Sequence, residues 1–391
     1  MHERLTGLPP ESEFDLNDMA TRITAGDAQD VALDIMNGVY GSAAQEGFLG
    51  GTLKRMAAPW TNRDQDPFEP LNDYIATFIG VVNDEVDYRE ILRANMVYTH
   101  PAVSTPYATN SNAHYEAIEA QAQPLRDLQQ VTQSSVSSLP AEATAGVMTT
   151  RAAAKAFFIL GTNRAMLRFT LMSQMCRDLE QMEDPSGVPD RIRQDVSRSP
   201  GGDSQLFLTG CVGCHIGMDP LAQAFAYYNY QHNPDGDDTT DDRENGFLMY
   251  NTSPQPNPEL GIDTRVQPKY HINANNFPYG YVTPDDQWDN YWREGTNEAI
   301  GWNWTGDAPN SGGNGAKTMG WELANSYAFA QCQVRKVFKS VCLRDPGDYD
   351  NGATVDTSDS QKVAEITDNF RANGFNMKRV FAETADYCKG E

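Results

Sequence analysis

A five-residue motif near the middle of the chain, Cys-Val-Gly-Cys-His at positions 211–215, constrains the fold more than any other feature. Chance is a poor explanation, because six cysteines and six histidines in 391 residues give an expected count of about 0.001 for this pattern. Three chemistries use two cysteines spaced in this way. They are a redox pair of thiols, a zinc site and the covalent attachment of haem.

The histidine helps to separate these three hypotheses. A zinc site needs two more ligands, usually from a second Cys-x-x-Cys or a close pair of histidines, and the sequence has no second cysteine pair. A redox pair leaves His215 without a role. Covalent haem uses all three side chains, because Cys211 and Cys214 form thioethers and His215 binds the iron. We therefore predict one haem c, attached through Cys211 and Cys214, with His215 as the proximal ligand.

The length of the chain and its local patterns predict a mainly α protein with several compact units. A chain of 391 residues with 39% apolar content can bury a large core and exceeds a minimal cytochrome. We predict a helical N-terminal region over 1–130 and a haem-binding domain over 131–320. A C-terminal helical module should follow over 321–391. Within the haem-binding domain, residues 231–320 lack helical periodicity and are rich in aromatic residues, so we expect an irregular segment there.

Capping residues and chain breakers locate the expected helices. Asp27 and Gly38 bracket one helix, and Asp219 with Pro220 indicates a new helix after the motif. The other helices are expected from about 71, then over 87–100, 113–130, 150–161, 163–182, 319–344, 359–373 and 376–388.

Charge and hydropathy exclude some partners. The net charge of −24 repels nucleic acid and anionic membranes, so we predict no nucleic-acid partner. No run approaches 18 apolar residues, so we predict no integral membrane span. The first residues are polar and lack a signal peptide, yet haem is attached to this motif outside the cytoplasm. We expect an exported protein, periplasmic, extracellular or at the cell surface, whose leader is absent from this sequence.

Four cysteines remain outside the motif, an even number that suggests two disulfides in an exported protein. Residues 326–342 read as one helix, which places Cys332 and Cys342 about 15 Å apart. A disulfide tolerates at most about 7 Å between Cα atoms, so these two should not pair. The residues leave two other pairings open, or four free thiols. We prefer Cys342 with Cys388, both at helix ends of one module, and Cys176 with Cys332.

The iron of a c-type haem usually takes a second axial ligand, Met or His. Met319 lies between a long loop and a helix, and it is our candidate distal ligand. His271 lies within the irregular segment and is the rival, whereas Met218 is expected to be structural. The remaining alternatives are that another residue is the distal ligand or that the sixth coordination position of the iron is open. We also expect aromatic residues of the irregular segment to pack on or near the porphyrin, namely Tyr270, Phe277, Tyr279, Tyr281, Trp288 and Trp292.

An acidic stretch over 233–244 has the ligand spacing of an EF-hand calcium loop. Asp238 stands where such loops need glycine, so a solvated acidic loop is the alternative. The oxygen ligands of a calcium ion would be Asn233, Asp235, Asp237, Asp241 and Glu244.

Several stretches together resemble a known family. Residues 145–176 precede the motif, residues 210–230 carry it with Met-Asp-Pro-Leu directly after it, and residues 319–346 follow near the C-terminus. This order, together with the helical segment at 70–92, resembles large bacterial cytochrome-like proteins built from domains first catalogued in planctomycetes. The resemblance covers about two-thirds of the chain. It implies haem and export, and it carries over only Cys211, Cys214 and His215.

The sequence therefore predicts an exported mono-haem c-type cytochrome. Its haem iron would cycle between two oxidation states and exchange electrons with redox partner proteins. One alternative is a peroxidase-like haem enzyme with an open sixth position. Another is a structural or filament subunit that assembles with itself and uses haem as a fold nucleus or electron relay.

Overall fold

The computed structural model describes residues 1–159, 163–193, 203–232, 243–258, 260–271, 280–308, 310–346 and 357–390. The fold is mainly α, as predicted. The α-helices are α1 (His2–Thr6), α2 (Glu13–Ala25), α3 (Ala28–Met36), α4 (Ser42–Glu46), α5 (Lys54–Ala57), α6 (Asp73–Asn83), α7 (Ala113–Ala120), α8 (Gln133–Val136), α9 (Arg151–Phe157), α10 (Arg164–Thr170), α11 (Ser204–Gly210), α12 (Val212–Ala222), α13 (Gly315–Ala324), α14 (Tyr327–Cys342), α15 (Thr357–Ala372) and α16 (Met377–Tyr387).

The described strands are short and form four antiparallel pairs, each with two members. They are β1 (Val97–Thr99) with β2 (Gln129–Val131), β3 (Tyr228–Gln231) with β4 (Phe247–Tyr250), β5 (Gln255–Asn257) with β6 (Ile262–Thr264), and β7 (Gln287–Asp289) with β8 (Gly312–Asn314). Short 3₁₀ and π helices complete the chain; those used below are η3 (Tyr88–Leu92), η7 (Leu171–Met175), η8 (Leu179–Met182) and η10 (Arg243–Asn245).

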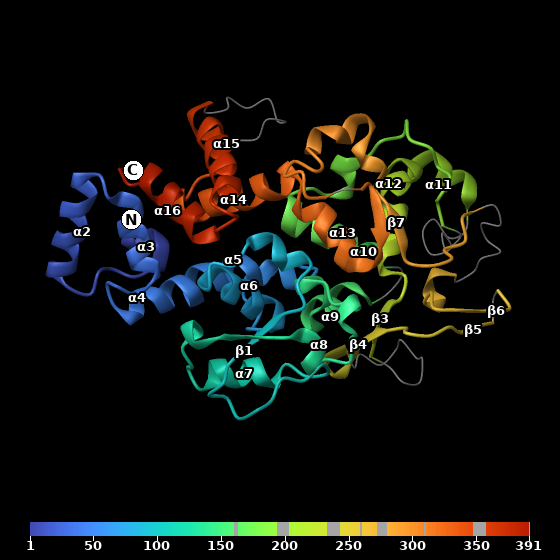
Figure 1. Ribbon diagram of the computed structural model, residues 1–391, viewed down its shortest axis with the longest axis horizontal. Coiled ribbons are helices and arrows are strands. Elements are labelled where there is room, and N and C mark those ends of the chain that lie inside the picture. The colour runs from blue at the N-terminus through green and yellow to red at the C-terminus, as the bar shows by residue number, and fades with distance from the viewer. Residues whose placement is uncertain are drawn as a thin grey trace.

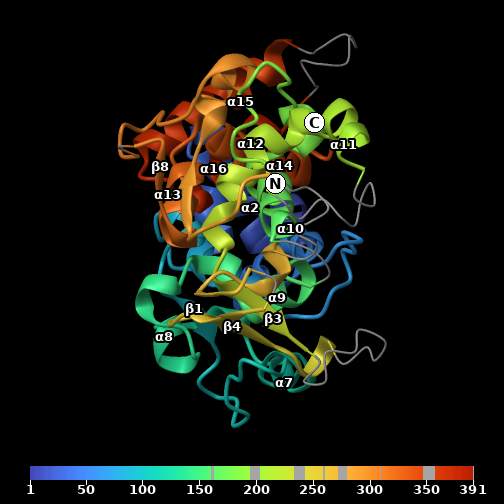
Figure 2. The same ribbon diagram turned by 90° about the vertical axis from the view of Figure 1, so that its right-hand side faces the viewer.

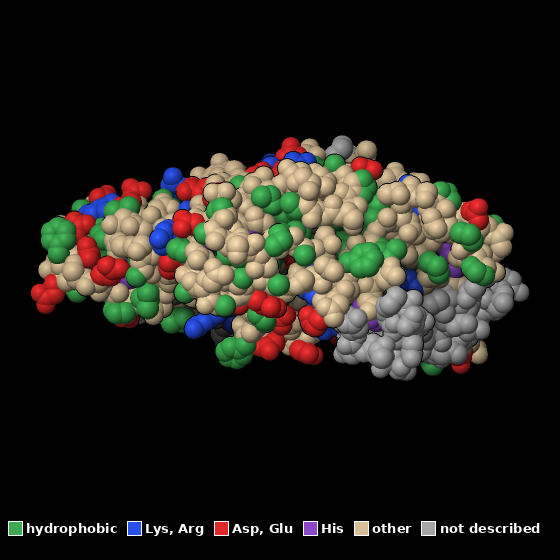
Figure 3. Space-filling view, turned by 90° about the horizontal axis from the view of Figure 1, so that it is seen from below, with side chains coloured by type: hydrophobic (Ala, Val, Ile, Leu, Met, Phe, Trp, Pro, Cys, Tyr) green, Lys and Arg blue, Asp and Glu red, His purple; other side chains and the backbone are tan. Residues whose placement is uncertain are grey.

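The molecule is elongated, and the two chain ends lie together. Figure 1 shows α2 and α3 with both termini at one end, and α11, β5 and β6 at the other. Figure 2, which looks at that second end, shows α11 and α12 near the viewer. The region around the motif is therefore distant from the chain ends. In Figure 3, acidic side chains appear on the face seen from below, with fewer basic ones among them.

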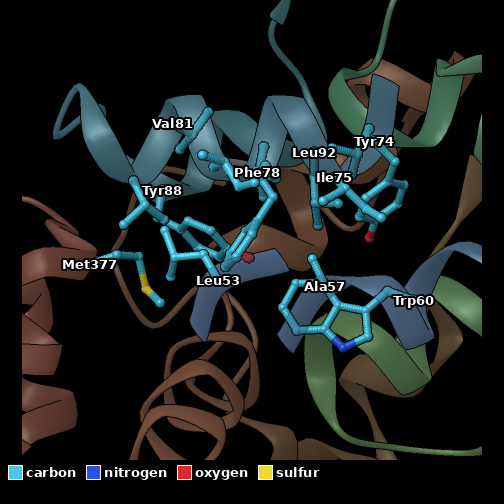
Figure 4. Close-up of a cluster of buried hydrophobic side chains, with 14 of the residues drawn as sticks. Leu53, Ala57, Trp60, Tyr74, Ile75, Phe78, Val81, Tyr88, Leu92 and Met377 are labelled. Carbon is cyan, nitrogen blue, oxygen red and sulfur yellow. The ribbon is translucent and has the colours of Figure 1, made fainter. Parts of the chain in front are cut away.

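One large cluster of buried apolar side chains extends from the N-terminal helices to the last helix. Its centre is α6, which begins close to the predicted position because the Asn72 side chain accepts a hydrogen bond from Ile75 N at 3.0 Å. In Figure 4, Phe78 of α6 lies between other aromatic rings, and it meets Trp60 edge-on with 5.0 Å between ring centroids. The cluster continues across both predicted domain boundaries, at 130/131 and at 320/321.

The C-terminal helices pack on the N-terminal ones. Phe381 of α16 meets Phe48 edge-on, with 5.0 Å between ring centroids. The Arg4 guanidinium donates to the carbonyl oxygen of Cys388 at 3.3 Å. Cys388 also forms a disulfide with Cys342, with 5.5 Å between Cα atoms.

A second disulfide joins Cys176, at the end of η7, to Cys332 of α14, with 5.3 Å between Cα atoms. Both preferred pairings are therefore confirmed. So is the exclusion of a bridge between Cys332 and Cys342, because α14 carries both as a single helix.

Two helices predicted in the first third of the chain are wrong. The expected helix over 87–100 is only a 3₁₀ turn, η3, followed by strand β1. The expected helix over 113–130 ends as α7 at Ala120, and its last residues form β2. Val97, Tyr98 and Thr99 favour extended backbone, and Tyr98 is fully buried beside Gly80 of α6. Packing of this strand outweighs the local helical signal.

Two further boundaries need correction. The expected helix over 319–344 is broken into α13 and α14, because the Ser326 hydroxyl accepts from Phe329 N at 3.2 Å and starts a new helix. Asp219 and Pro220 do not open a helix; they lie inside α12. The expected irregular segment does hold short strands and 3₁₀ turns in its described part, until α13 begins at Gly315. Within the described ranges, no helix combines the length and apolar character needed to cross a bilayer.

Candidate functional site: the Cys-x-x-Cys-His motif

The motif lies where two helices meet. Asp203 starts α11 by accepting from the backbone of Gln205 and Leu206, each at 3.0 Å. Cys211 ends α11 and precedes α12, and Cys214 and His215 lie in the first turns of α12. Both cysteines are half-buried free thiols. The other four cysteines form disulfides, so Cys211 and Cys214 are the pair that stays available for chemistry.

A buried carboxylate orients the histidine. His215 and Asp219 are four residues apart in α12, so they share a face of the helix. The Nδ1 atom of His215 lies 3.1 Å from Oδ1 of Asp219. A carboxylate only accepts hydrogen bonds, so Nδ1 carries the proton and Nε2 keeps its lone pair. This is the tautomer that a metal-binding histidine needs when Nε2 is the ligand.

Asp219 is itself fixed from a distant helix. Its side chain is fully buried, and Arg164 of α10 forms a two-pronged ion pair with it, with Nε to Oδ1 at 2.6 Å and the second nitrogen to Oδ2 at 2.8 Å. The backbone N–H of Arg193 donates to Oδ2 at 3.2 Å. Burial alone would raise the pKa of Asp219, but the charge of Arg164 and the hydrogen bond from His215 outweigh it and hold that pKa well below its usual range. Asp219 is therefore an ionised acceptor.

The histidine is neutral for a different reason. Burial lowers the pKa of His215 below its ordinary value; the nearby Arg164 and Arg193 lower it further, while Asp219 opposes them. A neutral imidazole with a free Nε2 lone pair is the form that binds a metal ion. The ring also packs edge-on against Phe207 of α11, with 4.7 Å between ring centroids.

The two competing chemistries fit the cysteines less well. A reactive redox thiol needs a lowered pKa. Burial raises the pKa of Cys214, and the carboxylates of Glu183 and Glu180 raise it further. Its Sγ contacts the carbonyl oxygen of Leu179 in η8 at 3.5 Å. For zinc, no three His, Cys, Asp or Glu side chains are grouped as metal ligands anywhere in the described part of the chain.

Two glycines let neighbouring segments approach the motif helix. A Cβ atom at Gly213 would collide with the Glu183 side chain, and one at Gly217 would collide with the indole of Trp292. The buried Nε1 of Trp292 has no hydrogen-bond partner among the described residues. A buried donor of this kind beside α12 is suited to an acceptor that the described residues do not supply.

Exposed apolar side chains surround the first cysteine. Leu206 and Leu208 of α11 are 55% and 48% exposed, three to five residues before Cys211. Neighbouring exposed leucines are costly in water and indicate contact with another apolar group. Together with the two thiols, the free Nε2 and the Trp292 donor, they fit a covalently attached porphyrin.

The structure places both candidate distal ligands inside the protein. Met319 of α13 is fully buried in the large apolar cluster, whereas His215 packs on Phe207 of a separate small cluster. The rival, His271, is buried with both ring nitrogens engaged: Nδ1 with Asn257 at 2.9 Å and Nε2 with the carbonyl oxygen of Thr283 at 3.1 Å. Met218 is buried in the large cluster, as a structural methionine would be. The distal ligand stays a prediction.

The aromatic residues expected near the porphyrin differ in whether they contact the motif helix α12. Trp292 packs on α12, and the Tyr270 hydroxyl donates to the carbonyl oxygen of Ala222 at the end of α12, at 3.2 Å. Trp288 is directed to α13 instead, where its Nε1 donates to Thr318 at 2.8 Å. Tyr281 donates its backbone N–H to Ile192, and Phe277 and Tyr279 lie outside the described residues.

Most of the proposed calcium loop lies outside the described residues. This holds for Asn233, Asp235, Asp237 and Asp241. Glu244, in η10, is described, and its carboxylate forms ion pairs with Lys155 and Arg151 of α9. Calcium binding therefore stays a prediction.

Sequence reasoning missed the residues that hold His215. The sequence predicts Asp219 at the start of a helix, although its spacing of four residues from His215 is a signal for a shared helix face. Arg164 gave no such signal, because 55 residues separate it from Asp219.

No protein-family model matches the chain, and neither does any curated protein or solved structure. The resemblance to planctomycete-type cytochromes therefore stays a prediction.

Proposed function

We propose that this protein carries one covalently attached haem c and transfers electrons. The observation that carries the proposal is the combination of two free thiols, Cys211 and Cys214, with the neutral His215 whose Nδ1 is held by Asp219. Cys211 and Cys214 would each form one thioether, and His215 would bind the iron through Nε2. The bound haem would supply a one-electron couple, and the residues around it would set the potential.

The chain's own contribution is electrostatic. Asp219 accepts a hydrogen bond from Nδ1–H of His215, and this makes the imidazole a stronger electron-pair donor at Nε2. Arg164 keeps that carboxylate ionised and in place. A stronger donor stabilises the oxidised metal, so this pair is expected to lower the reduction potential.

The first test is whether the pigment is covalent. Acid-acetone extraction of the purified protein should leave haem on the chain. Changing both Cys211 and Cys214 to Ala should release it, while Cys176→Ala with Cys332→Ala, which removes two disulfide cysteines, should not. A protein that contains zinc and shows no Soret band would overturn the proposal.

A second candidate function, a haem enzyme with an open sixth position, has its own support. Met319 is enclosed in the main core, and both nitrogens of His271 already have partners. A carboxylate-paired proximal histidine also suits chemistry at the iron. The spin state separates the two functions. A low-spin ferric spectrum with a band that Met319→Ala abolishes favours the carrier. A high-spin spectrum with rapid carbon monoxide binding after reduction favours the enzyme.

We also propose that the protein is exported and exchanges electrons with another protein. Its two disulfides support an oxidising compartment. The net charge of −24 would attract a partner with a basic surface, at a rate that falls as salt is added. Fractionation of the native cells, followed by haem staining, tests the location.

A further inference from the structure

A cleft of about 810 Å³ opens between α13, η3 and the β7–β8 pair. Much of its wall is apolar and comes from two alanines, two glycines and two tryptophans, namely Ala94, Ala308, Gly312, Gly313, Trp288 and Trp321. A concave site with mostly apolar walls and a few polar groups is typical of small-molecule binding. Neither α11 nor α12 contributes a lining residue, so this cleft is separate from the Cys-x-x-Cys-His motif. We call it the tryptophan cleft.

Hydrogen bonds between its elements fix the walls of the tryptophan cleft. Nε1 of Trp288 donates to the hydroxyl of Thr318 at 2.8 Å and so attaches β7 to α13, beside which it lies in Figure 1. Nε1 of Trp321 donates to the carbonyl oxygen of Asp307 at 3.1 Å and attaches the chain before β8 to the same helix. Both indoles are therefore oriented before any ligand arrives, which reduces the ordering cost of binding.

The two acidic side chains that line the tryptophan cleft are already paired. Glu322 is buried, and its carboxylate oxygens accept from the Arg293 guanidinium at 2.7 and 2.6 Å. Glu90 accepts from Nε of Arg93 at 2.9 Å. The Arg93 guanidinium also lies over the Trp321 ring, 3.4 Å from its centroid. Each pair is neutral as a unit, so neither carboxylate is left to repel an anion.

Lys317 of α13 is the lining cation that has no ion pair within the described part of the chain. Its ammonium donates to the carbonyl oxygen of Ala141 at 2.6 Å, which leaves two N–H donors for other acceptors. Burial lowers the pKa of Lys317, and the exposed Glu142 opposes this effect only in part. The lining segments 90–95, 288 and 308–322 are described except for Pro309, which carries no charge. A half-buried ammonium without a carboxylate partner is suited to an anionic ligand.

We propose that the tryptophan cleft binds a flat aromatic molecule that carries a carboxylate. The ring system would lie along the apolar wall, where the guanidinium of Arg93, stacked on Trp321, presents a flat cationic face to π electrons. The Arg93 side chain is 36% exposed, so part of that face is accessible. The carboxylate would accept hydrogen bonds from Lys317. This site does not depend on haem, because none of these groups belongs to the motif region.

Calorimetric titration of the full-length protein with three naphthalene derivatives tests this proposal, with pH and ionic strength held constant. The probes share one ring system and differ in one substituent: a carboxylate in naphthoate, a hydroxymethyl group in naphthalenemethanol, and a protonated aminomethyl group in naphthylmethylamine. Naphthoate should bind most tightly. The net charge of −24 favours the amine instead, so a preference for the carboxylate has to come from a local cation.

Three variants locate that cation. Lys317→Gln should weaken naphthoate binding by about tenfold and leave naphthalenemethanol within about twofold of the wild type. The unchanged alcohol would show that the cleft of this variant is intact. Lys317→Arg keeps the charge and should retain most of the naphthoate affinity. The control is Lys362→Gln, which removes the same charge from α15, outside the cleft, and should change naphthoate binding by less than about twofold.

Three results would overturn the proposal. The first is that no probe binds at millimolar concentration. The second is that the alcohol or the amine binds as tightly as naphthoate, because the carboxylate would then have no partner in the cleft. The third is that the Lys317→Gln variant binds naphthoate as tightly as the Lys362→Gln control.

Discussion

The helices near the chain ends and the segment around the motif differ in what fills their interior. In α3, α14 and α16, buried apolar side chains form one continuous cluster that two aromatic rings, Phe48 and Phe381, help to close. Around the motif, Ile192, Phe207 and Ile216 form a small separate cluster, whereas Met218 and Leu221 of α12 belong to the large one. Buried charged and polar groups, Asp219 above all, fill much of the remaining space.

This difference indicates which contacts each region can lose. A large apolar cluster distributes its stabilisation over many side chains, and one substitution removes only a part. A region with a small apolar core depends on a few polar contacts, and a buried charge left without its partner is costly. The motif region is therefore expected to be sensitive to single polar changes and to gain most from an added apolar group.

The largest effect is expected for Asp219→Asn. It removes the buried carboxylate from the ion pair with Arg164, whose side chain is 14% exposed, and it should cost about 3–5 kcal/mol in the free energy of unfolding. Urea denaturation measures this cost. The reduction potential of the haem protein should rise as well, because His215 loses its carboxylate acceptor.

Asp178→Asn is the matched control. It breaks the ion pair with Arg168, which has the same two-pronged geometry but lies at the surface, so it should cost less than about 1 kcal/mol. Equal costs for the two variants would contradict the difference between the regions.

The next largest effect is expected for removal of the disulfides. Cys176→Ala with Cys332→Ala, and Cys342→Ala with Cys388→Ala, should each cost about 2–4 kcal/mol. The first bridge joins positions 156 residues apart and the second 46, so the first should cost more. Hydrogen exchange should show the second loss confined to α14–α16. Equal loss of protection around α12 in both variants would show that the two regions unfold together.

A smaller, stabilising effect is expected for Lys336→Met in the helical region. Burial lowers the pKa of Lys336 to about 7, although Trp60 and the Ser173 carbonyl favour the ammonium. Between about pH 7 and pH 10 the unfolded chain holds this proton and the folded chain does not, so wild-type stability rises with pH. The variant should be about 1 kcal/mol more stable at pH 6, and this advantage should be lost well before pH 10. Urea midpoints at both pH values measure it. A pH-independent difference between the variant and the wild type would contradict this account.

The smallest effect is expected for Leu206→Gln with Leu208→Gln in haem-free protein. Both side chains are exposed, so the stability should change by less than about 0.5 kcal/mol. In haem-loaded protein the same change should cost more, because the porphyrin would cover these leucines. Thermal unfolding of the two forms gives the comparison. An equal cost in both would place the haem elsewhere.

The sequence predicted what depends on local spacing. The motif, the single helix that keeps Cys332 from Cys342, and the last two helices all follow from patterns within about 20 residues. Strand β1 was missed because its partner, β2, lies about 30 residues away and was itself assigned to a helix. The break before Ser326 was missed because a continuous apolar pattern hid a capping residue.

In the candidate site, too, the residues that follow a local spacing were predictable, and those brought together by the fold were not. Cys211, Cys214 and His215 were predicted from their spacing. Arg164, which holds Asp219, was not, because only the folded chain brings α10 to α12. The distal ligand could not be decided either, because Met319 and His271 are both plausible by type and only their surroundings differ.

Because the two chain ends pack on each other, the N-terminal helices can complete their core only after the last residues are synthesised. Arg4 donates to the carbonyl oxygen of Cys388, which is 384 positions later, and α3 packs on α16, so the earliest helices need residues that are made last. Until those residues emerge, the N-terminal helices have an uncovered apolar face and cannot complete their core. A chaperone that binds nascent or translocating segments would therefore find its target at α1–α3.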